Sequence, residues 1–254
     1  KETYAKLAAL EMGKPIKQGY AIIDKCAWLC EWYAENTEDI LKPEIVETQA
    51  QKSYVRFDPL GIVLAVMPWN YPYWQALRFI VPAAMAGNVG LLKHASNVPQ
   101  CAQALEDMFL EAGFPEGVFQ NLHIGSKKVE QIIRHQHVKA VTLTGSEWAG
   151  RKVAEIAGDE IKPSVLELGG SDPFIVLKDA DLNSACETGA LARLQNNGQS
   201  CIAAKRFIVE EAIAEEFTQL YVEKYRNIAV GDPMDENTDV GPMVNEAARD
   251  EIDE

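Results

Sequence analysis

Apolar and polar residues follow one another along most of the chain in a pattern that alternates between strands and helices. Short, continuous apolar runs such as GIVLAVMP are typical of strands that are buried on both faces of a sheet. The segments between these runs have apolar residues at helical spacing. The pattern predicts strands at 61–68, 89–93, 118–122, 140–143 and 164–168, and helices at 74–86, 98–112, 128–134 and 146–157.

This order predicts the fold class. Strands and helices that alternate with short connections are typical of an α/β fold, in which a parallel sheet is covered by helices on both faces. In such sheets, ligands bind beyond the carboxyl ends of the strands. The residues that directly follow each predicted strand are therefore the first candidates for a functional site.

The flanking segments extend this pattern. Helical spacing is present at 3–12 and 19–33, and the polar, β-prone segment 45–57 is typical of an extended arm or an edge strand. The alternation also continues towards the C-terminus, with a strand at 173–177, a helix at 182–195, a strand at 206–209 and a helix at 212–227.

We place a domain boundary at Gly169–Gly170, which divides the chain into residues 1–169 and 170–254. The chain starts with KETYAKLAALEMGK and stops with NEAARDEIDE, and both ends have helical spacing without a helix start or stop signal. We therefore expect a polypeptide that is truncated at both ends.

Composition and charge narrow the function classes. The net charge of −14 argues against nucleic acid as a partner, because phosphates require a basic face. No apolar run is long enough to span a membrane, and we expect no membrane association. The five cysteines form no C-x-x-C pair, which favours reduced thiols and a cytoplasmic location. Cys26 and Cys30 are predicted to share a buried helix face. The histidines have no partners at zinc spacing, so no metal site is expected.

Three residues at strand ends have the chemistry of a phosphate site. Gly145 and Ser146 stand at a strand-to-helix junction, where glycine lets a phosphate approach the positive end of a helix. Ser146 is also an ordinary N-cap residue, and a plain capped helix is the alternative. Lys93 ends a buried strand. It could reach a phosphate or a ribose, or simply extend its ammonium group to water.

Three residues could carry covalent chemistry. Cys201 follows the glycine turn in QNNGQSC, which would give the sulfur access and supply backbone N–H groups for an oxyanion. Asn70, in PWNYP, could donate to the same oxyanion, or could stabilise a turn. Glu167, at the end of a strand, could be a partly buried carboxylate with a raised pKa that acts as a general base, or the partner of an ion pair.

The motifs PWNYP, LLKHAS, LTGS, LELGGSDPFIV and NNGQSCIAAKRF occur in this order, and together they resemble the NAD(P)-dependent aldehyde dehydrogenase superfamily. The resemblance extends from about Lys1 to Ala248 and is strongest to the bacterial succinate-semialdehyde dehydrogenase branch. It implies a Rossmann-like cofactor domain at 1–169, with 45–57 as part of an oligomerisation arm, followed by the N-terminal part of an α/β catalytic domain at 170–254.

The resemblance implies roles for single residues. Cys201 resembles the catalytic thiolate, Asn70 the oxyanion-stabilising amide and Glu167 the general base. Together they imply attack on an aldehyde, hydride transfer to the cofactor and hydrolysis of a thioester. The positions that correspond to cofactor-binding residues are Trp69, Lys93, Ser96, Gly145, Ser146 and Leu168.

The resemblance also bears on cofactor and substrate. Many NAD-preferring members carry a glutamate at the position of Ser96, and its carboxylate would repel a 2′-phosphate. We therefore expect NAD and NADP as cofactors, with NADP favoured. Arg78 corresponds to an arginine that binds the distal carboxylate of succinate semialdehyde, and a surface salt bridge is the alternative. Some members have a second arginine where this chain has Gln195, which we assign to the substrate site together with Arg78.

The sequence leaves four alternative functions open. They are oxidation of other short or medium aliphatic aldehydes, transfer of the acyl group to coenzyme A, a generic nucleotide-binding module with Cys201 incidental, and a non-catalytic fragment that keeps only the fold. Glu167 argues against coenzyme A as acceptor, because a hydrolytic base is present. When full length, the enzyme is expected to be a homodimer or homotetramer. Residues 1–254 alone are expected to be inactive, since the family's catalytic domain continues further.

Overall fold

The computed structural model describes residues 1–253. Contacts within the chain divide it into two compact units, which are described separately. The first unit consists of Ala21–Glu167 together with Lys1, and the second consists of Glu2–Tyr20 together with the chain from Leu168 onwards. These units are defined by contacts alone and not by function. The division into functional domains at 1–169 and 170–254 therefore stays a prediction.

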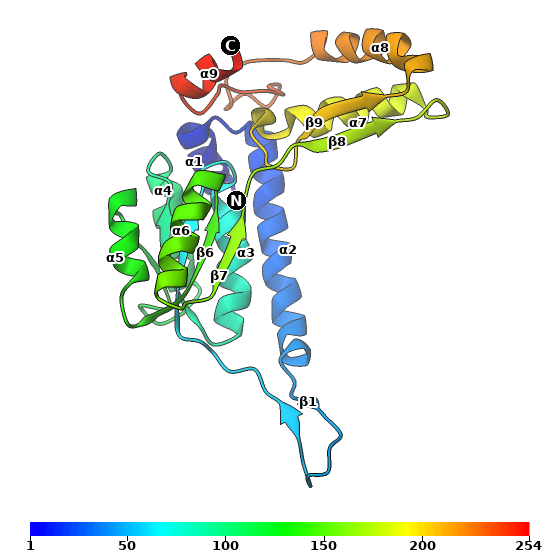
Figure 1. Cartoon of the computed structure of the whole chain (residues 1–254). Helices are drawn as coiled ribbons and strands as arrows, with labels where there is room; N and C mark the ends of the chain where they lie inside the picture. The colour runs from blue at the N-terminus through cyan, green and yellow to red at the C-terminus, as the bar shows by residue number, and fades with distance from the viewer. Residues whose placement is uncertain (254) are drawn as a thin grey trace. The chain divides into compact units, whose positions relative to one another are not determined.

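The first unit is built on a five-stranded sheet with the order β5-β4-β3-β6-β7, and every neighbouring pair is parallel. This confirms the predicted α/β fold with a parallel sheet. Figure 1 shows β6 and β7 side by side and pointing the same way. The bounds of the strands in this sheet are β3 (Ile62–Met67), β4 (Val89–His94), β5 (Phe119–Asn121), β6 (Val138–Thr144) and β7 (Ser164–Glu167).

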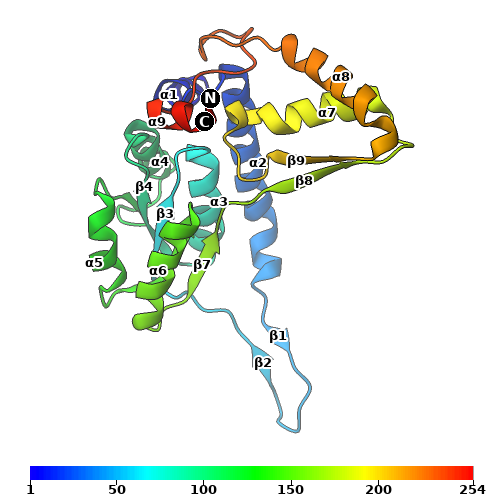
Figure 2. The ribbon, with the colours of Figure 1, turned by 45° about the horizontal axis from the view of Figure 1, so that its top comes forward.

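Helices cover both faces of this sheet, as seen in Figures 1 and 2. Helices α3 (Pro72–Met85) and α4 (Pro99–Glu111) pack on one face, and both have proline in the first turn, where no helical hydrogen bond is lost. The other face carries the short helix η1 (Ser126–Lys128), α5 (Val129–Ile133) and α6 (Glu147–Asp159).

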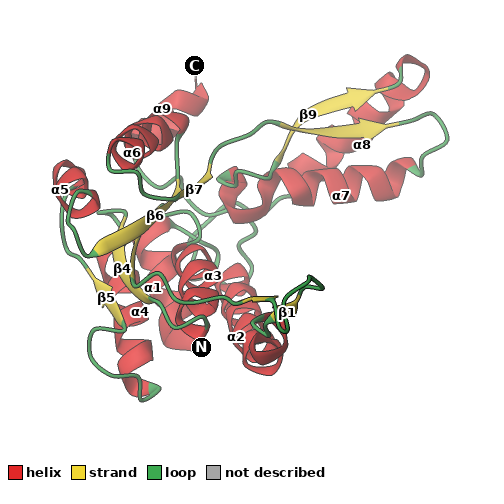
Figure 3. Ribbon diagram, turned by 60° about the horizontal axis from the view of Figure 1, so that its bottom comes forward, coloured by secondary structure: helices red, strands yellow, loops and turns green. Residues whose placement is uncertain are grey.

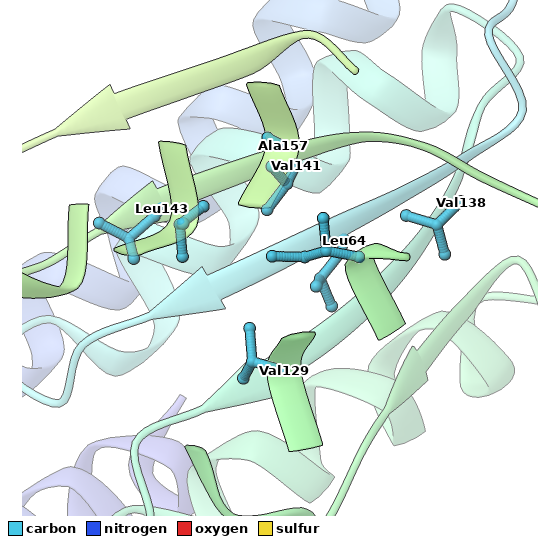
Figure 4. Close-up of a cluster of buried hydrophobic side chains, with 8 residues drawn as sticks. Leu64, Val129, Val138, Val141, Leu143 and Ala157 are labelled. Carbon is cyan, nitrogen blue, oxygen red and sulfur yellow. The ribbon is translucent and has the colours of Figure 1, made fainter. Parts of the chain in front are cut away.

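A hydrophobic core lies between the sheet and α5 and α6 (Figure 4). Leu64 of β3 and Val141 and Leu143 of β6 contribute to a cluster with Val129 of α5 and Ala157 of α6, and all five are buried. Burying one such leucine or valine side chain stabilises the fold by about 1.5–3 kcal/mol. This packing fixes the strands, and therefore the residues that follow them.

A hairpin connects α2 (Ile16–Ile40) to the sheet. It consists of β1 (Glu44–Ile45) and β2 (Tyr54–Val55), which pair antiparallel (Figure 2). The segment predicted as an extended arm or edge strand thus has only two short strands. Its side chains face solvent, with Ile45 69 % exposed.

The second unit contains a two-stranded parallel sheet with helices α7 and α8 beside it (Figure 3). Val176, Cys186 and Phe217 form its buried centre, and Phe174 and Phe207 pack around them. The elements are α1 (Glu2–Met12), β8 (Asp172–Val176), α7 (Leu182–Leu194), η2 (Gln195–Gly198), β9 (Ala204–Val209), η3 (Glu211–Ile213), α8 (Ala214–Arg226) and α9 (Glu246–Asp253).

Two expectations about α2 were wrong. The helix predicted at 19–33 extends over Ile16–Ile40, because no helix-breaking residue occurs between Pro15 and Pro43 except Gly19. Cys26 is buried, as predicted, but Cys30 is exposed, because α2 buries only a narrow stripe. Within residues 1–253 no helix combines the length and the apolar character needed to cross a membrane.

Candidate active site

Four of the predicted site residues come from the carboxyl ends of neighbouring parallel strands. Asn70 follows β3, Lys93 lies next to the end of β4, Ser146 follows β6, and Glu167 ends β7. The register aligns them. Val66 pairs with both Lys93 and Leu143, and Thr144 pairs with Glu167. The sheet therefore brings these four positions to one edge, where ligands of parallel sheets bind.

The junction between β6 and α6 has the features of an anion site. Ser146 is the N-cap of α6, and its Oγ accepts a hydrogen bond from the backbone N–H of Ala149 at 3.3 Å. A Cβ on Gly145 would meet only a side-chain carbon of Leu143 at 3.7 Å, so the backbone there is open to a ligand. The ordinary helix cap is thus present, and it leaves the positive end of α6 accessible.

Lys93 is the basic residue of this edge. Its side chain is half-buried, and burial lowers the pKa of the ammonium group below its ordinary value. Trp69 and Asn70 are partly exposed in the loop before α3, and Ser96 is exposed after β4. A lysine, an aromatic ring and a helix N-terminus at one edge are suited to a dinucleotide phosphate and its sugar.

Glu167 and Arg78 contact one another. Nη2 of Arg78, on α3, lies 3.9 Å from Oε2 of Glu167, and both line a cavity of about 590 Å³ whose walls are mainly apolar. The side chain of Glu167 is 56 % exposed. The expectation of a partly buried carboxylate was therefore wrong, because β7 is an edge strand with little cover in this unit.

In the second unit, Cys201 is half-buried and follows an unusual turn. Asn196 and Asn197 have φ values of 60° and 58°, and Gly198 has 72°, so three consecutive residues are left-handed. The turn predicted before the cysteine is present, but it is less open than expected. Asn196 and Asn197 are buried, and the N–H of Gln199 donates to Asn196 at 3.0 Å.

The remaining predicted residues lie on the flanks of the second unit. Leu168 is 36 % exposed directly after β7. Gln195, at the end of α7, is exposed and lines a cavity of about 330 Å³ along that helix. The roles of Leu168 and Gln195 in ligand binding stay predictions.

Sequence reasoning missed two lysines that contact the segment around the cysteine. Lys205 donates from Nζ to the carbonyl oxygens of Cys201 at 2.6 Å and Gly170 at 2.7 Å. Lys14 is 1 % exposed and donates to Oδ1 of Asn196. The local signal for Lys14 was its position between Gly13 and Pro15, directly after the helix predicted at 3–12.

Comparisons with known proteins show which family the chain is similar to. A model of the aldehyde dehydrogenase family matches residues 1–254. A succinate-semialdehyde dehydrogenase (NADP+) of Mycobacterium avium is 57 % identical over 251 residues, which cover 98 % of this chain and 53 % of that protein. A probable succinate-semialdehyde dehydrogenase (NADP+) of Synechocystis sp. is 55 % identical over 243 residues, covering 96 % of this chain and 54 % of the relative.

A solved structure is similar as well. The crystal structure of succinic semialdehyde dehydrogenase from Streptococcus pyogenes, in complex with NADP+, superposes with a TM-score of 0.96 at 37 % identity, covering 99 % of this chain and 55 % of that one. The chain thus spans about half the length of the relatives it matches. On the family model and on these identities, the chain belongs to the aldehyde dehydrogenase family.

Proposed function

We propose that the protein oxidises an aldehyde that carries a distal carboxylate, namely succinate semialdehyde to succinate, with NADP+ as the favoured oxidant and NAD+ as an alternative. The observation that supports this most is the alignment of Asn70, Lys93, Ser146 and Glu167 at one edge of the sheet. The names of the similar proteins, succinate-semialdehyde dehydrogenases that use NADP+, support the same substrate and cofactor.

The residues present fit a dinucleotide. Lys93 supplies a cation, the N-terminus of α6 at Ser146 supplies backbone donors, and Gly145 leaves space for a phosphate to approach. Trp69 supplies an aromatic wall, and Leu168 an apolar contact. Ser96 carries no charge, so nothing at that position repels a 2′-phosphate, while Lys93 attracts it. When bound, the nicotinamide cofactor accepts the hydride that leaves the aldehyde carbon.

The chain's own residues carry the other steps. The sulfur of Cys201, as thiolate, adds to the aldehyde carbon, and the carbonyl oxygen becomes an alkoxide that accepts hydrogen bonds from the Asn70 amide and the Cys201 backbone N–H. Loss of the hydride leaves a thioester on Cys201. Glu167 then takes a proton from water as the water attacks the thioester carbon, and the C–S bond breaks to release the acid and the thiolate.

Substrate choice is assigned to Arg78 and Gln195. A planar guanidinium donates two parallel hydrogen bonds to the two oxygens of a carboxylate. An aldehyde without a carboxylate has no such pair of acceptors. Arg78 lies in the same cavity as Glu167, with its side chain 40 % exposed and its planar end available to a ligand. Gln195 adds an amide donor without a second charge.

The active form is proposed to be a cytoplasmic homodimer or homotetramer. The β1–β2 hairpin supports self-association, because apolar side chains that are about half exposed lie along it, including Tyr54, Val55 and Phe57. Such chains are favourable to bury against a second copy. We further assign cofactor binding to residues 1–169, and the nucleophile to the domain that starts at residue 170.

The proposed function is tested by measuring NADPH formation on the full-length protein with succinate semialdehyde, butyraldehyde and acetaldehyde, each with NADP+ and NAD+. We expect the highest kcat/KM for succinate semialdehyde with NADP+, and no turnover in Cys201→Ser. Cys30→Ser is the matched control, because Cys30 is exposed on α2 and should leave turnover unchanged. Turnover that survives in Cys201→Ser would refute the proposed chemistry, and a preference for uncharged aldehydes would refute the substrate.

A further inference from the structure

The turn before Cys201 has three consecutive residues in the left-handed backbone region. Asn196 and Asn197 are left-handed although they carry side chains, and Gly198 continues the same conformation. Asparagine adopts this region more readily than most residues, but two in succession are unusual. Such a backbone persists only where the surrounding structure holds it, so the contacts of this turn identify what positions the cysteine.

Some of those contacts come from the segment between α1 and α2 and from the first turn of α2, and others come from Gly241 and Pro242. Lys14 donates to Oδ1 of Asn196, and Nδ2 of Asn197 donates to the carbonyl oxygen of Gly13 at 2.8 Å. The backbone N–H of Asn196 donates to Oε1 of Gln18 at 2.7 Å. Both asparagine side chains of the turn are thus held by residues about 180 positions earlier in the chain.

Lys14 is an unexpected residue at this place. Its side chain is 1 % exposed, and burial lowers its pKa from 10.5 to about 7, because the ammonium group loses its hydration. An apolar residue of similar length would fill the same space without this penalty. The contribution of the lysine is therefore expected to lie in the hydrogen bond that it donates.

A continuous path leads from this hydrogen bond to the cysteine. The carbonyl oxygen of Asn196 accepts from the N–H of Gln199 at 3.0 Å, and Nδ2 of Asn196 donates to the carbonyl oxygen of Gln199 at 3.2 Å. Gln199 is separated from Cys201 only by the buried Ser200. On the other side, Lys205 donates to the carbonyl oxygen of Cys201. The backbone of the cysteine is held from both directions.

We propose that Lys14 is a positioning residue for Cys201. Lys14 holds Asn196, and it thereby sets the direction of the cysteine's sulfur and backbone N–H. The inference rests on the proposed function of Cys201 as the nucleophile. Lys14 itself takes no part in bond making. A shift of the reacting atoms by about 1 Å lowers turnover by up to about 100-fold, so a positioning residue is expected to have a large effect on kcat.

The test compares Lys14→Met with Lys14→Gln in the full-length protein. The two side chains have nearly the same length and volume, and only glutamine can donate to Asn196. Lys6→Met is the matched control, because Lys6 lies on the same N-terminal segment but is exposed and pairs with Glu2. The measurements are kcat, KM for NADP+, the rate of Cys201 alkylation by iodoacetamide, and Tm.

For Lys14→Met we expect kcat per titrated active site and the alkylation rate of Cys201 to fall by about 10-fold to about 100-fold. KM for NADP+ should stay within about 2-fold of the wild type, because the proposed cofactor residues other than Leu168 belong to the first unit. Lys14→Gln should recover part of the loss, and Lys6→Met should show none.

Three results would overturn the inference. They are an unchanged kcat in Lys14→Met, equal losses in Lys14→Met and Lys14→Gln, and a loss explained entirely by a lower fraction of titratable sites. If Lys14→Met does not fold, Asn196→Gly takes its place, since glycine permits the left-handed backbone but removes the acceptor of Lys14. This variant should show the same fall in kcat, and wild-type kcat would overturn the inference. A wild type without aldehyde oxidation would refute the proposed function instead.

Discussion

Nη2 of Arg78 lies 3.9 Å from Oε2 of Glu167, so the guanidinium assigned to the substrate's carboxylate and the carboxylate assigned to water activation line one cavity. Both side chains are substantially exposed, and an ion pair of this kind contributes at most about 1 kcal/mol. A substrate carboxylate can therefore displace Glu167 from Arg78 at little cost. Substrate binding would then leave Glu167 available as a base.

The first prediction concerns Arg78→Ala. A hydrogen bond to a charged group contributes about 1.5–3 kcal/mol, so KM for succinate semialdehyde should rise by about 10-fold to about 100-fold. KM for butyraldehyde, which has no carboxylate, should change little. Steady-state kinetics on both aldehydes measure this difference. Arg249→Ala, which removes an exposed arginine paired with Asp250, is the control, and equal effects on both aldehydes would reject the assignment of Arg78.

The second prediction concerns Lys93 and pH. Burial lowers the pKa of Lys93 from its ordinary value of 10.5. Below this lowered pKa the ammonium group is charged and attracts the 2′-phosphate, and the attraction is lost as the pH rises through it. As the pH is raised, KM for NADP+ should therefore begin to rise at a lower pH than it would if an exposed lysine bound the phosphate.

Lys93→Met tests this directly. The variant should raise KM for NADP+ by about 10-fold at neutral pH, because a charge-assisted hydrogen bond is lost, and it should remove the alkaline rise in KM. Lys152→Met, on the exposed face of α6, should do neither. An alkaline rise that persists unchanged in Lys93→Met would show that another group is responsible.

The third prediction concerns the selectivity of the thiols. Burial raises the pKa of Cys26 to about 12 and also raises the pKa of Cys186. Partial desolvation and the charge of Glu31 raise the pKa of the exposed Cys30, so all three thiols have little thiolate at neutral pH. Iodoacetamide should therefore modify Cys201 first, with loss of NADPH formation in the same proportion. Peptide mapping by mass spectrometry identifies the modified residue, and first labelling of any other cysteine would count against Cys201 as the nucleophile.

The fourth prediction concerns the segment that holds the turn. Gly13 has φ +75°, and a Cβ there would lie 2.7 Å from the carbonyl oxygen of Pro242. Gly13→Ala should lower the free energy of unfolding by about 2–4 kcal/mol, through backbone strain and the clash together. Gly113→Ala is the control, because Gly113 has φ +87° with nothing within 4 Å, and strain alone should lower stability by about 1 kcal/mol. Urea unfolding curves measure both values, and equal losses would mean that the contact with Pro242 is absent.

The sheet could be predicted from the sequence because its strands are buried on both faces and therefore leave continuous apolar runs. The predicted strand 61–68 corresponds to β3, Ile62–Met67, and 89–93 corresponds to β4, Val89–His94. The strand ends follow from the same signal, so the sequence placed Lys93 and Ser146 at the correct edge. Their roles in binding stay predictions.

What could not be predicted depends on contacts between distant parts of the chain. The exposure of Glu167 depends on what covers an edge strand, which no local pattern encodes. The hydrogen bond between Lys14 and Asn196 joins residues 182 positions apart, and neither residue type indicates the other. The left-handed backbone at Asn197 likewise depends on Gly13, because asparagine alone permits this conformation without requiring it.

The most direct test of the account is a single turnover of Glu167→Gln in the full-length protein with NADP+ and succinate semialdehyde. Without the proposed base, the thioester should still form, but its hydrolysis should be slow. One equivalent of NADPH should therefore appear together with a succinyl group on Cys201. Intact mass spectrometry and peptide mapping detect this adduct. The account predicts the adduct on Cys201 alone. NADPH formation without an adduct on Cys201, or with an adduct on another residue, would contradict it.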